Sequence, residues 1–160
     1  MKSAHRIASQ AKRHALNLTS NPVWRAFAQA PMSQAQQVDI ALAARIAFEE
    51  VSRGRGIADH IDTLACAANV SLVLAERGYG PECEPKIIDA QAALMRVKAR
   101  QQQGKPIGLD GPGAQALRDL MDIHEQQIEH AGKAEVASAL IEINTRRVSG
   151  QVMSVGAGVS

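Results

Sequence analysis

Four stretches of this chain carry apolar residues at helical spacing, and glycine or proline interrupts the chain between them. The expected helices begin at Ser33, Asp59, Pro85 and near Ala114. Residues 104–113 hold four glycines and two prolines, too many for a regular element, so they predict the one substantial internal loop. No stretch shows strict two-residue alternation. The sequence therefore predicts an all-α fold, an antiparallel bundle of four to five helices with a basic N-terminal arm.

Each expected helix has one apolar stripe that we assign to the core. The alanine-rich composition and the scarcity of aromatic residues favour helices that pack closely over strands. The last helix either breaks at Gly132 or runs on through Val136, Leu140, Ile143 and Val148, which decides between four helices and five. The four expected stripes are Val38, Leu42, Ile46 and Val51; Ile61, Leu64, Ala65, Ala68, Leu72 and Ala75; Ile87, Ile88, Gln91, Leu94, Met95 and Lys98; and Leu117, Leu120, Met121, His124, Ile128 and Ala131.

Charge divides the chain into a basic arm and a mildly acidic body. No Asp or Glu precedes Asp39, and the five cations before it leave 13 of the 18 Lys and Arg residues against all 16 carboxylates. We expect an arm with short helices at 1–32, a helical bundle at 33–149 and a disordered tail at 150–160. The cations of the arm are Lys2, Arg6, Lys12, Arg13 and Arg25.

The arm carries the two features that predict partners. Its cations could neutralise the phosphates of duplex nucleic acid, or meet an acidic protein, with an affinity that falls as salt rises. Trp24 and Phe27 lie three residues apart and form an apolar anchor for the chain's own bundle or for a partner helix. The arm also shares the composition of an organelle transit peptide, but it lacks the apolar run of a secretory signal.

The cysteines and the hydropathy pattern predict the setting of the protein. Cys66 and Cys83 have neither a close pairing nor a metal-ligand spacing, so a disulfide framework and a zinc site have little support. We expect a reducing, cytoplasmic environment. No apolar run is long enough for a membrane span, and we expect no cofactor.

Candidate metal ligands gather at 122–130, but their spacing fits no metal helix. His124 and His130 are six residues apart and point in different directions on a helix, and no Glu stands three residues before either. We therefore predict no metal site, and we expect His124 to be a hydrogen-bonded core residue. An enzyme built on Asp122, His124, Glu125, Glu129 and His130 remains a third hypothesis.

Three other motifs have ordinary structural interpretations. Residues 64–71 resemble the turn region of repressor helix-turn-helix units, but the implied recognition helix would turn Leu72 and Val73 towards base edges, so one continuous buried helix is expected. Residues 108–113 could hold an anion, but no strand precedes them, so we expect a plain interhelix loop. Neighbouring carboxylates disfavour a Cys83 thiolate, Cys66 is expected to be inert packing, and no catalytic residue is predicted.

These patterns predict a small, non-enzymatic helical adaptor or regulatory protein that acts through protein contacts and forms a homo-oligomer. The alternative is a nucleic-acid-binding accessory protein whose basic arm contacts the phosphate backbone. The partner, the pathway and the oligomeric state lie beyond what the residues alone predict.

Overall fold

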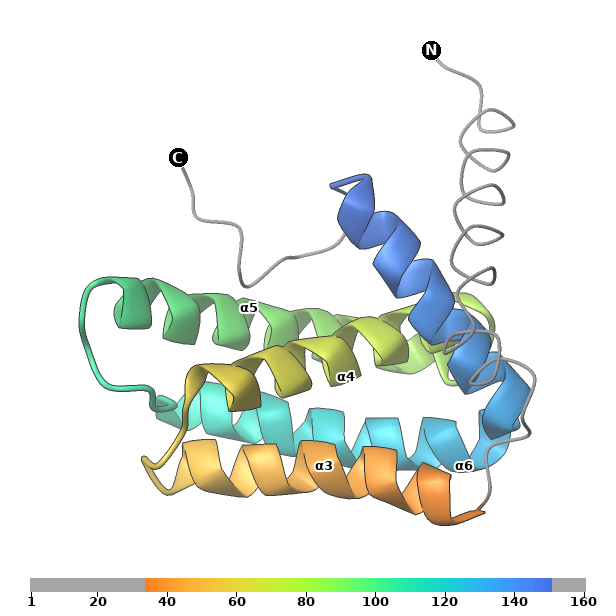
Figure 1. Ribbon diagram of the computed structural model, residues 1–160, viewed down its shortest axis with the longest axis horizontal. Helices are drawn as coiled ribbons and strands as arrows, with labels where there is room; N and C mark the ends of the chain where they lie inside the picture. Colours follow the sequence, from red (N-terminus) through yellow and green to blue (C-terminus); the bar gives the residue numbers. More distant parts are fainter. Residues whose placement is uncertain (1–33, 151–160) are drawn as a thin grey trace.

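The chain is all-helical wherever the computed structural model describes it, at residues 34–150, and no strand occurs in that range. Consecutive helices run in opposite directions (Figure 1). The prediction of an all-α fold is therefore confirmed, while the arm at 1–32 and the tail after Gly150 lie outside the described residues. The elements are α3 at Gln34–Ser52, α4 at Ala58–Glu76, the 3-10 turn η1 at Pro81–Cys83, α5 at Glu84–Gln102 and α6 at Gly111–Val148.

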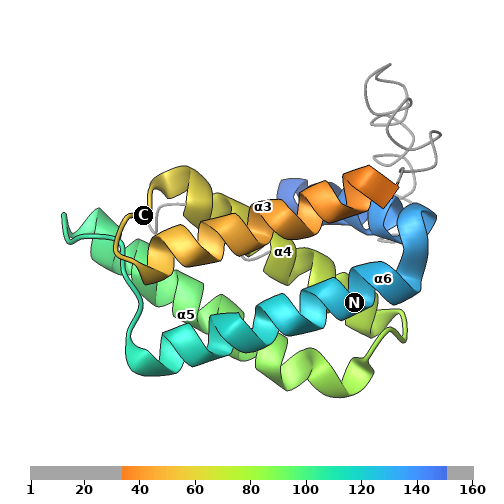
Figure 2. The ribbon, with the colours of Figure 1, turned by 90° about the horizontal axis from the view of Figure 1, so that it is seen from below.

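The four helices pack together with α4 and α6 in the middle. These two contact each other, and each also contacts α3 and α5, so α3 and α5 lie on opposite edges of the bundle (Figures 1 and 2). The main core joins Phe48 of α3 and Leu64 of α4 to Leu94 of α5 and Leu120 of α6. No helix in the described part of the chain is both long and apolar enough to cross a bilayer.

Local chemistry sets the helix starts close to the predicted positions. Asp110 is the N-cap of α6, and its Oδ1 accepts a hydrogen bond from the Gly113 N–H at 2.6 Å, so this helix begins at Gly111 rather than near Ala114. The N-cap of α4 is Ile57 rather than the predicted Asp59. There the His60 Nδ1 accepts from the Ile57 N–H at 3.2 Å.

Gly132 divides α6 into two parts, residues 111–131 and residues 133–148. Its backbone has φ 74° and ψ 177°, a conformation that is accessible almost only to glycine, and the helix changes direction there (Figure 1). The helical pattern therefore breaks at Gly132 and resumes after it. The second part crosses the C-terminal half of α4 and builds a smaller apolar cluster there, formed by Val70, Val73, Leu74, Ile128, Val136, Ala139 and Ile143.

An ion-pair network joins this second part of α6 to the end of α4. Arg77 contacts Glu135 at 3.0 Å and Glu142 at 2.5 Å. Arg146 contacts Glu76 at 2.5 Å and also pairs with Glu142. Because Glu142 lies between the guanidinium groups of Arg77, just after α4, and Arg146 of α6, it links the network across the interface.

Two of the predicted core stripes are wrong in part. Leu42 and Ile46 are 48% and 51% exposed, and α3 instead buries Ala44, Ala47 and Phe48, while Val51 is buried as predicted. The side chain of Val38 lies outside what the structure describes. In α5, Ile87 and Leu94 are buried as predicted, but Ile88 and Met95 are 46% and 41% exposed. Both helices are apolar on more than one side, so helical spacing alone could not identify the side that faces the core.

The helix-turn-helix alternative for residues 64–71 is wrong, because these residues lie within α4. Residues 58–76 form one uninterrupted helix, and Ser71 is buried inside it rather than starting a second helix. Asn69 stays helical, and its Oδ1 accepts a hydrogen bond from the Gln91 side chain of α5 at 2.9 Å. The prediction of one continuous buried helix is confirmed.

Candidate functional site

Two apolar stripes remain exposed on the described surface, one at each edge of the bundle. Leu42 and Ile46, four residues apart on α3, form the α3 stripe. Ile88, Ala92, Met95 and Ala99 recur at intervals of four, three and four residues on α5, all exposed, and form the α5 stripe. Such spacing places each set on one side of its helix. Contiguous exposed apolar surface is typical of contact sites.

The outward position of the α3 stripe is fixed by contacts on the other side of the helix. Arg45, next to the stripe in sequence, donates to Glu125 of α6 at 2.8 and 2.9 Å and lies 3.4 Å from Asp122. Phe48 and Val51 are buried against the main core. Turning the stripe inwards would break these ion pairs and expose both core side chains.

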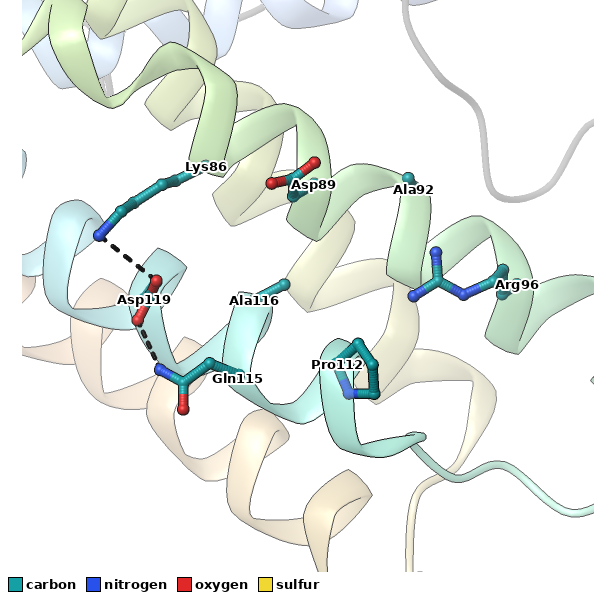
Figure 3. Close-up of a pocket in the computed structure, with 8 residues that line it drawn as sticks. All are labelled: Lys86, Asp89, Ala92, Arg96, Pro112, Gln115, Ala116 and Asp119. Carbon is teal, nitrogen blue, oxygen red and sulfur yellow. Dashed lines mark hydrogen bonds and ion pairs between the residues drawn. The ribbon is translucent and has the colours of Figure 1, made fainter.

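The α5 stripe borders a shallow groove of about 440 Å³ between α5 and the first part of α6 (Figure 3). Lys86 pairs with Asp119 at 3.4 Å, and Arg96 pairs with Asp110 at 3.4 Å. Asp89 lies between these two cations along α5, is exposed, and takes part in no ion pair within residues 34–150. The groove thus has a free carboxylate and a half-exposed guanidinium beside the apolar stripe.

No protein-family model matches this sequence, and no curated protein or solved structure is significantly similar to it. The function must therefore be inferred from the residues and their arrangement.

The closest approach to catalytic geometry is a buried pair, Ser71 of α4 and His124 of α6. Ser71 Oγ lies 3.0 Å from His124 Nδ1, within hydrogen-bonding distance, as in a nucleophile activated by a base. Both residues are almost fully buried, at 0% and 1% exposure, so no substrate can reach the hydroxyl in this conformation. The pair therefore joins α4 to α6, and the prediction of a hydrogen-bonded core histidine is confirmed.

Buried polar atoms surround this pair, and not all of them have a hydrogen-bond partner. Gln127 Nε2 donates to the carbonyl oxygens of Ser71 at 3.1 Å and Tyr79 at 2.8 Å. His124 Nε2 and Gln127 Oε1 are buried without a hydrogen-bond partner in the described structure. Burial lowers the pKa of His124 to about 4, so the imidazole is neutral at pH 7.

The acidic and histidine residues at 122–130 do not converge on one site. Arg45 forms ion pairs with Asp122 and Glu125, while His124 is buried in the core. His130 is exposed and lies within hydrogen-bonding distance of the Gln126 carbonyl of its own helix. Across residues 34–150, no three His, Cys, Asp or Glu side chains are placed to hold a metal ion together. The enzyme hypothesis thus has no assembled ligand or catalytic set in this region.

The structure also tests the possible anion site in the loop before α6 and the expectation for Cys66. The Gly113 N–H that an anion would need is occupied by the Asp110 carboxylate, in line with a plain interhelix loop. Cys66 is exposed on α4, so the expectation that it packs in the core is wrong, but desolvation raises the pKa of its thiol, in line with an unreactive cysteine. Cys66 faces solvent because the neighbouring core positions of α4 are Leu64, Ala67 and Ala68.

The residues that the sequence singled out in the arm lie outside the described part of the chain. They stay predictions, as phosphate or acidic-partner contacts for the cations and as a partner anchor for the two aromatic residues: Lys2, Arg6, Lys12, Arg13, Arg25, Trp24 and Phe27. Sequence reasoning missed the α5 stripe because it assigned Ile88 and Met95 to the core. The signal that could have found it is the recurrence of apolar residues at Ile88, Ala92, Met95 and Ala99, a second helical stripe beside the one that faces the core.

Proposed function

We propose that this protein is a small, non-enzymatic helical adaptor or regulator that works through protein contacts and forms a homo-oligomer. The observation that carries the proposal is the pair of exposed apolar stripes on opposite edges of the bundle. In the described range the other exposed large apolar residues, Ile57 and Val148, stand singly. A bundle with two separate apolar edges can contact two molecules at once, which is what an adaptor requires.

The character of the polar sites supports a contact function over a catalytic one. The buried Ser71–His124 pair is closed to solvent, and Arg45 engages two of the carboxylates on α6. The groove beside α5 is open, and its charged groups are spread along it, with Lys86 and Asp119 paired towards one end, rather than converging on one point (Figure 3). Small-molecule sites usually have polar groups that converge within a concave pocket.

Site-specific photocrosslinking in the native cell tests this proposal. A photoreactive residue replacing Leu42 or Ile88 should give discrete protein adducts, because each lies on an exposed apolar stripe. The same residue replacing Glu129, which is exposed and polar on α6, should give few adducts. Equal labelling at all three positions, or none at any, would contradict a contact function.

A second candidate function is binding to nucleic acid through the basic arm. It is supported by the absence of any carboxylate before Asp39, since five cations in that segment meet no neutralising charge along the chain. Affinity for duplex DNA or RNA should then fall steeply with salt, and deletion of residues 1–32 should abolish it. Binding that survives the deletion, or that does not change with salt, would reject this candidate.

A further inference from the structure

The α5 stripe has the arrangement of a surface that pairs with itself. We propose that a second copy of this chain packs its own α5 antiparallel along the stripe, giving a two-fold symmetric dimer. This inference rests on the proposed function, and it specifies which edge self-associates and in which direction. Three features of α5 carry it: the order of large and small residues, the order of charges, and the free Asp89.

The order of side-chain sizes favours an antiparallel seam. Along the stripe, large and small residues alternate, with Ile88, Ala92, Met95 and Ala99 in turn. An antiparallel second copy can place Ile88 opposite Ala99, and Ala92 opposite Met95, so that every layer joins one large and one small side chain. A parallel copy in register would place like opposite like. Facing large and small residues fill the space between helices most evenly.

The order of charges favours the same direction. Within residues 81–105, the carboxylates Glu82, Glu84 and Asp89 all precede the centre of the stripe, and every cation except Lys86 follows it. An antiparallel copy brings the acidic half of one α5 beside the basic half of the other, whereas a parallel copy would bring like charges together. Complementary charge across an interface determines register and partner choice.

One charge pair follows directly from this register. When Ala92 faces Met95, Asp89 lies beside Arg96 of the second copy, and two-fold symmetry forms the pair twice. Asp89 has no ion-pair partner in the described residues of its own chain. Arg96 is half exposed and makes only a 3.4 Å contact with Asp110, so its remaining donors are open to a second carboxylate.

The size of the contact sets the expected strength. From Ile88 to Ala99 the seam extends about 17 Å along the helix, a short contact compared with permanent dimer interfaces. We therefore expect a reversible dimer whose population depends on protein concentration.

Sedimentation equilibrium of the full chain over about a hundredfold range of concentration tests the surface. The wild-type mass should rise from 17.1 kDa towards twice that value, and the double variant Ile88→Ser/Met95→Ser should stay at 17.1 kDa. The matched control is Leu42→Ser/Ile46→Ser, which removes the same kind of surface from α3 and should associate like the wild type. Circular dichroism melting shows whether each variant is folded.

Charge exchange tests the direction. Asp89→Arg and Arg96→Asp should each weaken the dimer by about tenfold, because each places like charges together twice. Combining the two should restore affinity to within about threefold of the wild type, since the pair then forms with its partners exchanged. A combined variant that is as weak as either single variant would overturn the antiparallel register.

The remaining outcomes separate this inference from the proposed function. A dimer that survives Ile88→Ser/Met95→Ser but is lost in the α3 control would overturn the α5 surface while leaving a self-associating adaptor in place. A wild-type chain that stays monomeric throughout would reject both the inference and the proposed homo-oligomer.

Discussion

At the scale of single residues, His124 is buried in the core as predicted, but its partner and its unpaired second nitrogen were not predicted. A neutral histidine at 1% exposure hydrogen-bonds Ser71 and leaves its second nitrogen unpaired. An unpaired buried polar atom costs free energy, of the order of 1–3 kcal/mol. The pair therefore adds specificity to the contact between α4 and α6 more clearly than it adds stability.

His124 should make the fold sensitive to acid. Its pKa in the folded protein, about 4, lies below the ordinary value of 6.5, so the unfolded chain binds the proton more readily. Stability is then complete above about pH 6.5, declines as the pH falls, and levels off below about pH 4. Between about pH 7.5 and pH 5 this single group should cost about 2 kcal/mol.

Urea unfolding of the wild type and His124→Gln at these two pH values measures that cost. The variant should lose about 2 kcal/mol less than the wild type on acidification, because its other histidines are unchanged. An equal loss in both proteins would show that His124 does not titrate as its burial implies.

Gly132 should tolerate no side chain, for a conformational rather than a steric reason. A Cβ added there would meet no atom within 4 Å, but its φ is +74° with an extended ψ. Gly132→Ala should therefore destabilise the fold by about 1–3 kcal/mol. Gly108→Ala is the control, because that position also has open space but no positive φ. Equal melting temperatures for the two variants would contradict this explanation.

At the scale of elements, α5 has a buried side and an exposed side that both carry large apolar residues. Ile87 is fully buried and its neighbour Ile88 is 46% exposed. Ile87→Ala should cost about 2–5 kcal/mol, and Ile88→Ala less than about 1 kcal/mol. Chemical denaturation at low protein concentration, where self-association is absent, gives both values. Similar costs for the two would mean that α5 is rotated relative to the structure.

The same two-sidedness explains why α3 was assigned the wrong stripe. Leu42 and Ile46 are larger than Ala44 and Ala47, yet the alanines are buried, because small residues let α3 approach α4 and α6 closely. Arg45 and its two carboxylate partners on α6 then hold that rotation. A prediction that buries the most hydrophobic side of α3 would have placed Leu42 and Ile46 in the core instead.

At the scale of the whole molecule, the bundle has a main core and a smaller cluster of its own under the second part of α6. Residues 133–148 lie beyond the kink and contact the C-terminal half of α4 through that cluster and the network around Glu142. Burial raises the pKa of Glu142, but hydrogen bonds from Arg77 and Arg146 outweigh it and lower the pKa overall. The carboxylate is therefore ionised at neutral pH. Because residues 133–148 have a cluster of their own, we expect this unit to open more easily than the main core.

Glu142→Gln should loosen the second part of α6 selectively. Removing the charge between the two guanidinium groups should reduce amide protection in residues 133–148 by about tenfold, with little change in α5. Hydrogen exchange measured by mass spectrometry resolves the two regions. Glu129→Gln is the control, since Glu129 forms no ion pair within residues 34–150. A uniform loss of protection would show instead that the bundle opens as one unit.

The sequence by itself determined the helical class and the approximate bounds of the helices from α3 to α6. Helix periodicity, capping residues and chain breaks at glycine and proline act within a few residues of each other, so they can be detected without a three-dimensional structure. The same local pattern placed His124 in the core. It also identified Gly132 as the position where the last helix either breaks or continues.

Only the tertiary structure decided which sides of α3 and α5 are buried, that Ser71 is the partner of His124, and that the chain turns at Gly132. Ser71 and His124 are 53 residues apart, and no local signal connects them. The positive φ of Gly132 accompanies the packing of the second part of α6 on α4. Where a helix is apolar on two sides, spacing cannot choose between them, because burial depends on the volume available between neighbouring helices.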